Sequence, residues 1–215
     1  AAFLVVTIAG ERLELARLQQ VTGAAQATLL LLLGILLTGL LLLGWSFDGG
    51  VRLFGLGLAG LALWLGRHDI AKRTVKQAGL TRFIAICLLT GYVWLGISGV
   101  SAMLFGGVPV GPQYDATLHA FFLGFVFAMI FAHAPIIFPA VLGARMAYRP
   151  LFYAHVVLLQ VTLVVRLIGD AAGWSAGRQV GGLLNAVTLL LFLVNTVSAL
   201  QSPPERAGTA QGRGA

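Results

Sequence analysis

The sequence predicts an all-α fold, a polytopic transmembrane bundle of about six spanning helices with an N-terminal helix remnant. Three observations predict it. Of the 215 residues, 59% are apolar and only 10% are charged, whereas soluble domains carry about 25% charged residues. The apolar residues form blocks of about 20, the length at which a helix crosses a hydrocarbon core about 30 Å thick. Loops rich in Lys and Arg also alternate along the chain with loops that contain few of them.

The expected spanning helices are bounded by charges or by Gly/Pro clusters. In chain order they cover residues 26–47, 51–66, 83–105, 117–142, 151–170 and 179–200. The second is short, and Gly49 and Gly50 before it predict a tight hairpin with the first. Residues 1–10 are apolar and resemble the end of a longer helix, so we expect that the chain is truncated or that it begins inside a larger protein.

The loops predict the orientation, because short cytoplasmic loops collect Lys and Arg. Eleven of the 14 basic residues fall on one predicted side: Arg12, Arg17, Arg67, Lys72, Arg73, Lys76, Arg82, Arg145, Arg149, Arg206 and Arg213. The opposite loops contain Asp48, Asp115 and Asp170 with only Arg52 and Arg178. We therefore expect the N-terminal segment and the C-terminal tail to be cytoplasmic. The net charge of +7 then reflects membrane topology and does not indicate nucleic-acid binding.

Residues 1–200 are expected to form a single transmembrane domain, and residues 201–215 a disordered tail, because the tail has no apolar face to bury. The single cysteine, Cys87, excludes an internal disulfide and a cysteine-based zinc or iron–sulfur site. The segment from Gly55 to Gly60 matches the glycine pattern of dinucleotide-binding turns, but it lies inside an apolar helix. Small residues at this density predict close helix packing instead.

Polar residues within the spans are the candidate functional residues, because an ionisable group in the bilayer costs about 2.5 kcal/mol or more. His119, His133, His155 and Arg166 meet this criterion. In a regular α-helix His119 and His133 project within about 40° of each other but lie about 21 Å apart along the axis. This geometry predicts two separate sites, or a path between two sites, and excludes one shared metal ion.

Depth along the helices adds two further residues. A rise of about 1.5 Å per residue places Tyr92 and Gln160 level with His133, which predicts a polar layer in the middle of the membrane. Pro135 and Pro139 follow His133 and predict a kink beside it. A structural interpretation is also open, in which a histidine only donates a hydrogen bond to a neighbouring helix. His68, in a basic loop, is expected to be solvated.

Three short motifs carry a family resemblance over residues 80–170. They are Leu118-His119-Ala120 followed by Gly124, Gly143 and Arg145; the segment from Leu89 to Leu95 with Tyr92 and Trp94; and Val165-Arg166. In these motifs the chain resembles the C-terminal half of the NnrS family, polytopic membrane proteins associated with haem, copper and the response to nitric oxide. His119 matches the family pattern best and Arg166 next, whereas a further histidine that the family carries near Gly143 is absent.

The resemblance implies a haem or haem–copper protein of redox or nitric-oxide physiology. Neutral imidazoles of His119, His133 and His155 would be axial or copper ligands, and Arg166 would pair with a haem propionate. Two alternatives stay open. One is a non-catalytic membrane subunit or scaffold, and the other is a transporter or proton pathway that uses His119, His133, Tyr92 and Gln160 as relay groups. The expected partners are the lipid bilayer and, for a subunit, other membrane proteins.

Overall fold

The computed structural model describes residues 2–17 and 22–201, and the side chains of residues 2–11 and 22–200. Within this part of the chain, six helices are long and apolar enough to cross a membrane. The predicted fold class, a polytopic helix bundle with a short N-terminal helix, is therefore confirmed. The expected tail lies outside the described residues, apart from Gln201.

The six spans match the six predicted blocks, with ends displaced by a few residues. They are α2 (Gly23–Leu42), α3 (Phe47–His68), α5 (Gly79–Phe105), the continuous helix α6 (Pro112–His119), η1 (Ala120–Val126) and α7 (Phe127–Leu142), then α8 (Phe152–Ala171) and α9 (Ser175–Ser198). The shorter elements are α1 (Ala2–Arg17), α4 (Ala71–Thr74) and the strands β1 (Arg145–Met146) and β2 (Leu200–Gln201), which pair antiparallel.

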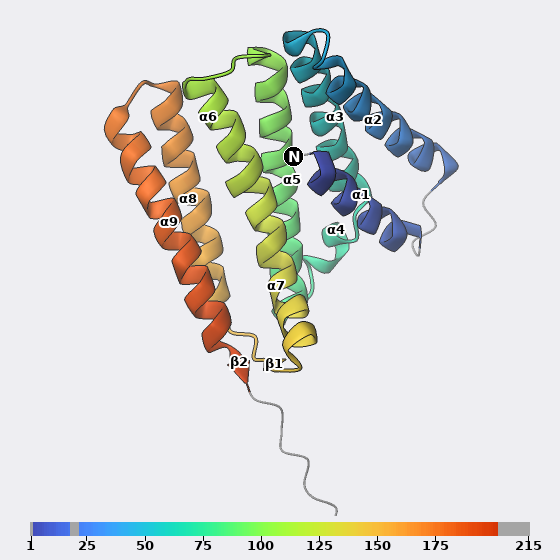
Figure 1. Cartoon of the computed structure of the whole chain (residues 1–215). Coiled ribbons are helices and arrows are strands. Elements are labelled where there is room, and N and C mark those ends of the chain that lie inside the picture. The colour runs from blue at the N-terminus through green and yellow to red at the C-terminus, as the bar shows by residue number, and fades with distance from the viewer. Residues whose placement is uncertain (1, 18–21, 202–215) are drawn as a thin grey trace, which may run out of the picture.

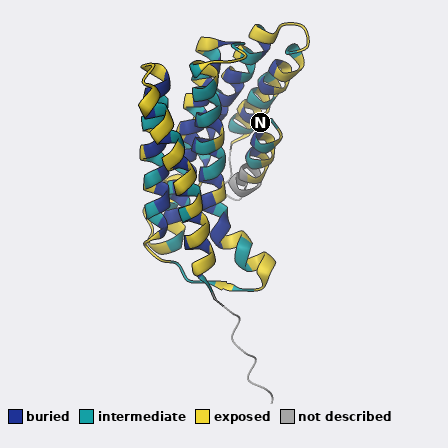
Figure 2. Cartoon of the chain, turned by 60° about the vertical axis from the view of Figure 1, so that its left-hand side comes forward, coloured by how far each residue is buried: buried dark blue, intermediate teal, exposed yellow. Residues whose placement is uncertain are grey.

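The long helix from α6 to α7 and its neighbour α5 occupy the middle of the bundle (Figure 1). The α8–α9 hairpin lies on one side of them and the α2–α3 hairpin on the other, with α1 against α2 and α3. Buried residues face the inside of the bundle, and exposed residues follow the outer faces (Figure 2). Because exposed Leu63, Leu183 and Leu190 lie on these outer faces, they are suited to lipid and not to water.

The predicted hairpin between the first two spans is present, but its glycines lie elsewhere than expected. Ser46 caps α3 by accepting a hydrogen bond from the Gly49 N–H at 3.3 Å, so Gly49 and Gly50 belong to the first turn of the helix. A Cβ atom on Gly50 would lie 2.7 Å from the Leu43 nitrogen. These glycines therefore allow α2 to approach α3, and the turn itself precedes them.

The glycine-rich segment of α3 packs against helices on two sides, which confirms the packing interpretation. A Cβ atom on Gly55 would lie 2.7 Å from the Gly99 carbonyl oxygen of α5. A Cβ atom on Gly57 would lie 2.8 Å from Leu36 Cβ of α2. Small residues thus bring three spanning helices into backbone contact, as is typical of membrane bundles.

The predicted topology can be tested by cysteine labelling, with Cys87 replaced by alanine, since that thiol is fully buried. Val110, 74% exposed between α5 and α6, and Lys76, exposed between α4 and α5, lie at opposite ends of α5. We expect an impermeant maleimide to label Val110→Cys in intact cells and Lys76→Cys only after permeabilisation. Labelling of both variants from the same side would contradict six spans with alternating loops.

Candidate functional site

Five polar side chains meet where α6, α8 and α9 come together, and we call them the ionic cluster: Asp115, His119, Arg166, Asp170 and Arg178. The Arg166 Nη2 atom lies 2.5 Å from Asp115 Oδ2, and its Nη1 donates to the Arg178 carbonyl at 3.0 Å. Its Nε lies 3.9 Å from Asp170 Oδ2. Arg178 Nε lies 2.6 Å from Asp170 Oδ1, and its Nη2 lies 4.0 Å from Asp115 Oδ2. Charge pairs therefore connect three helices.

The local sequence of α8 and α9 makes room for this cluster. A Cβ atom on Gly181 would lie 2.8 Å from the backbone nitrogen of Arg166, and one on Gly169 would lie 2.6 Å from the backbone nitrogen of Arg178. The turn between the helices contains Gly173 at φ 64°, a conformation that favours glycine. The hairpin is therefore narrow enough for arginines on both helices to reach the same carboxylates.

The charges of the cluster balance. Two arginines face two aspartates, and the Asp170 side chain is only 1% exposed whereas that of Asp115 is 30% exposed. Burying ions at a membrane protein's helix ends is costly unless each one has partners of opposite charge. This arrangement provides such partners for both carboxylates. The cluster can hold helices together, and its half-exposed edge can face a ligand.

His119 and His133 each form a contact with their own helix that fixes the ring. The Nδ1 of His119 lies 2.8 Å from the carbonyl oxygen of Asp115, and the Nδ1 of His133 lies 2.6 Å from that of Met129. A carbonyl oxygen can only accept, so Nδ1 carries the hydrogen in both rings. In the neutral imidazole the lone pair that can bind a metal is then on Nε2. His68 has the same type of contact, with Trp64 at 3.0 Å, so the pattern alone is not specific.

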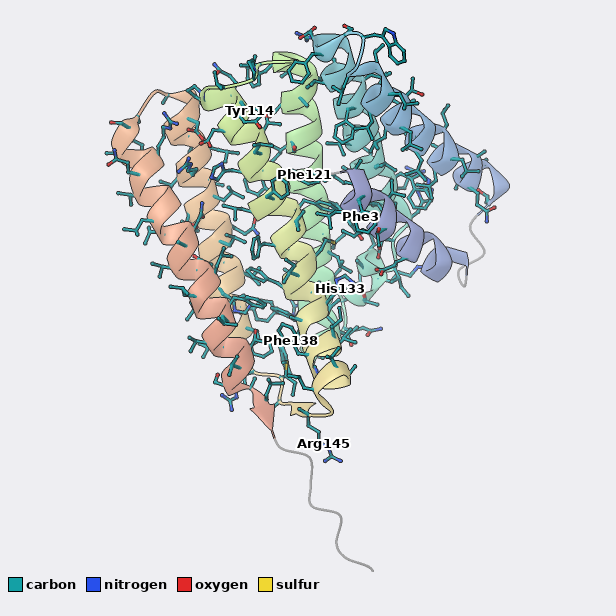
Figure 3. All side chains as sticks on the ribbon, viewed as in Figure 1. Phe3, Tyr114, Phe121, His133, Phe138 and Arg145 are labelled. Carbon is teal, nitrogen blue, oxygen red and sulfur yellow. The ribbon has the colours of Figure 1, made fainter. Side chains whose placement is uncertain are left out.

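The expectation that His119 and His133 share a face is wrong, because the π-helix η1 lies between them. Its i to i+5 hydrogen bonds, such as that from the Phe127 N–H to the Phe122 carbonyl, add one residue to a turn. Everything after η1 is rotated by about 100°, and the angle between the two histidines grows from about 40° to about 140°. The long helix can be followed from Tyr114 past His133 (Figure 3).

The neighbours of the two histidines agree with this rotation. His119 lies on the face that meets α8, because its ring is 3.4 Å from the carboxylate of Asp115, and that carboxylate pairs with Arg166 of α8. On α7, it is Phe131 that contacts His155 of α8, with ring centroids 4.7 Å apart. His133, two residues later, projects about 200° from Phe131 and so lies on the other side of α7.

His155 lies in an aromatic environment. It is 1% exposed, and the rings of four phenylalanines surround it: Phe83, Phe131, Phe152 and Phe192. Its Nδ1 lies 3.4 Å from Asn195 Nδ2. Among the described residues its Nε2 has no hydrogen-bond partner. His155 is therefore packed as part of the aromatic core.

The two residues expected in the polar layer have different partners. The Tyr92 hydroxyl donates to the Asp69 carboxylate at 2.7 Å, near the end of α3. Gln160 accepts from the Trp94 indole N–H at 2.5 Å, between α8 and α5. Trp94 also lies against η1, because a Cβ atom on Gly124 would overlap its side chain. Trp94 thus connects the π-helix to a polar residue of α8.

Two pairs within the ionic cluster are recognisable from their spacing in the sequence. Arg166 and Asp170 are four residues apart on one helix, and so are Asp115 and His119 on another, a separation that places side chains side by side. A rise of about 1.5 Å per residue also predicts that both pairs lie near the same boundary of the membrane. The spacing could not predict that α6 lies beside α8, because that depends on tertiary packing.

The positions of these side chains limit the metal or haem sites that the described residues can form. Within the described residues, no group of three or more His, Cys, Asp or Glu side chains could hold a metal ion. A copper centre with three such ligands is therefore not formed by the described residues alone. A haem requires only one or two axial ligands from the protein, so a single histidine with a fixed Nδ1–H fits that role better.

These elements define a helical membrane protein that crosses the bilayer several times. The chain belongs to the family described as a domain of unknown function, DUF8744, whose model matches residues 1–201. No curated protein matches the chain. No solved structure matches it either.

Proposed function

We propose that this membrane protein binds haem, with Nε2 of His119 as an axial ligand and His133 as the ligand of a second, separate site. The observation that carries the proposal is that two rings well inside the spanning helix Pro112–Leu142 each have Nδ1 against a carbonyl oxygen of that helix, at 2.8 Å and 2.6 Å. Ligating histidines usually donate their other ring N–H to a carbonyl or carboxylate, which fixes the tautomer and orients the ring. His119 has both types of oxygen beside it.

The ionic cluster restricts which residues take part. Asp115 holds the His119 ring on the face toward α8 and joins it to Arg166. Two guanidinium nitrogens of Arg166, Nη1 and Nη2, already donate to oxygen atoms of the chain, so we assign Arg166 to the cluster and not to a propionate. The four phenylalanine rings around His155 favour a structural role for it, so we propose His119 and His133 as the ligands. Haem, when bound, would supply electron transfer or gas binding, as the resemblance to the NnrS family favours.

Copper is the alternative ion under the same proposal. Because the described residues contain no group of three suitable ligands, a copper ion at His119 or His133 would need ligands from another chain or from outside this part of the chain. Because the two histidines lie about 21 Å apart along the axis and η1 turns them to different faces, copper would occupy two mononuclear sites and not one shared centre.

A non-catalytic membrane subunit is the second candidate, and the ionic cluster favours it. Both arginines and both aspartates of the cluster find opposite charges within the chain, as expected when polar residues only hold helices together. In this case no cofactor would bind, and His119 would serve only to support Asp115.

An absorption spectrum separates the two candidates. We expect the purified protein, expressed with added haem, to show a Soret band that His119→Ala removes or shifts, because the axial ligand is lost. His133→Ala should change a separate fraction of the signal. Added imidazole should restore the band in His119→Gly, which a purely structural role of the ring would not predict.

His68→Ala is the matched control, because His68 makes the same contact with its own helix outside the proposed sites. It should leave the spectrum unchanged. If neither haem nor copper copurifies with a folded, monodisperse protein in stoichiometric amounts, the non-catalytic subunit becomes the better assignment.

A further inference from the structure

A groove runs along the outer surface between α3 and α5, away from the ionic cluster. Its volume is about 980 Å³, and small residues such as Ala62, Gly66 and Gly96 contribute to its lining. A Cβ atom on Gly66 would have nothing within 4 Å, and one on Gly96 would touch only Ala62, at 3.5 Å. The groove thus exists because side chains are missing where two helices lie side by side.

The walls of the groove are apolar and exposed. Leu63 is 77% exposed, Val93 62% and Val100 47%. They belong to α3 and α5, two of the helices long and apolar enough to span the membrane. Because such outer faces contact lipid chains in a bilayer, the natural occupant of the groove is an acyl chain.

One end of the groove is cationic. Arg67, in the last turn of α3, and Lys72, in α4, line it there. Both residues are exposed, and in the part of the chain that the structure describes neither forms an ion pair. The acidic residue between them, Asp69, is turned inward and is 8% exposed. Its carboxylate accepts from the Tyr92 hydroxyl and from the Ala71 N–H, both at 2.7 Å.

We propose that an anionic phospholipid binds in this groove, with its phosphate at Arg67 and Lys72 and an acyl chain along α3 and α5. The charge pattern carries the inference, because two cations at the end of an apolar groove match a lipid whose anionic head lies at the end of its hydrocarbon chain. A peptide helix would match these cations only if it carried an acidic residue at this end. The basic residues lie at the end of the spans, where headgroups lie.

The test compares two lipids with identical acyl chains, phosphatidylglycerol and phosphatidylcholine, added to the purified full chain in detergent. Native mass spectrometry should show tighter binding of phosphatidylglycerol. In the double variant Arg67→Gln/Lys72→Gln, the ratio of the affinities for the two lipids should fall by a factor of about 20 to 30. Added salt should lower this ratio in the wild type. Arg145→Gln/Arg149→Gln removes two charges on the same predicted side, outside the groove, and should keep the preference.

A second variant tests the groove itself. Gly66→Phe places a ring where the structure has open space, so the protein should keep its melting temperature while binding of both lipids falls. Equal binding of the two lipids by the wild type, or an unchanged preference in Arg67→Gln/Lys72→Gln, would overturn the proposal. A dimer that forms without bound lipid and dissociates in Gly66→Phe would also overturn it, since the groove would then be an interface between copies.

Discussion

Gly99→Leu is expected to abolish the accumulation of folded protein in membranes. A Cβ atom at this position of α5 would lie 2.5 Å from the Ala59 nitrogen and 2.7 Å from the Gly55 carbonyl oxygen, both backbone atoms of α3. Backbone atoms cannot rotate away as a side chain can, so the two helices would have to separate. Overpacking typically costs about 1–3 kcal/mol of stability. Because the clash here is with backbone atoms, we expect a cost of about 3 kcal/mol or more.

The measurement is the membrane yield and the melting temperature of the purified variant. Gly34→Leu is the matched control, because a Cβ atom on Gly34 in α2 would have nothing within 4 Å. That control should fold as the wild type does. A normal melting temperature for Gly99→Leu would mean that α3 and α5 do not cross as closely as the structure has them.

The crossing also shows what sequence patterns can and cannot predict. The density of small residues in the segment from Gly55 to Gly60 predicted close packing, and the structure confirms it. The pattern could not say which helices pack there, and in fact Gly55 meets α5 whereas Gly57 meets α2. A glycine indicates that a neighbour can approach, but the neighbour's identity is set by the whole bundle.

The spanning helices were predictable because the hydrophobic thickness of a bilayer imposes a length on each block. Their ends were less predictable, because capping residues and turns decide them. Ser46 begins α3 ahead of the glycines, and Pro112 at the N-terminus of α6 begins that helix five residues before the predicted block.

The π-helix η1 was not predictable from the apolar pattern. Its seven residues, Ala120–Val126, are as apolar as any α-helical stretch of this chain, so the periodicity contains no signal of the extra residue in the turn. The inference that His119 and His133 share a face assumed a regular helix and failed for this reason. A prediction that two residues many turns apart share a helix face fails whenever such an irregularity lies between them.

Arg166→Leu is expected to destabilise the protein by about 3–5 kcal/mol, the typical cost of removing one partner from a buried ion pair. The Arg166 side chain is 17% exposed and contacts Asp115 and Asp170. Without it, two carboxylates share the charge of Arg178 alone. Arg178 lies 2.6 Å from Asp170 but 4.0 Å from Asp115, so the Asp115 carboxylate loses more of its electrostatic stabilisation than the Asp170 carboxylate does.

The double variant Arg166→Leu/Asp115→Asn tests this reason directly. It removes the carboxylate that has lost its partner, so it should be more stable than Arg166→Leu alone, although Asp115→Asn alone should be less stable than the wild type. Asp48→Asn is the control, because that ion pair with Arg52 is half-exposed, at 61% and 46%, and should contribute much less. Thermal unfolding in detergent measures all four variants. If the two losses in the double variant simply added, the carboxylate would not depend on Arg166, and the ionic cluster would not be what holds α6 against α8.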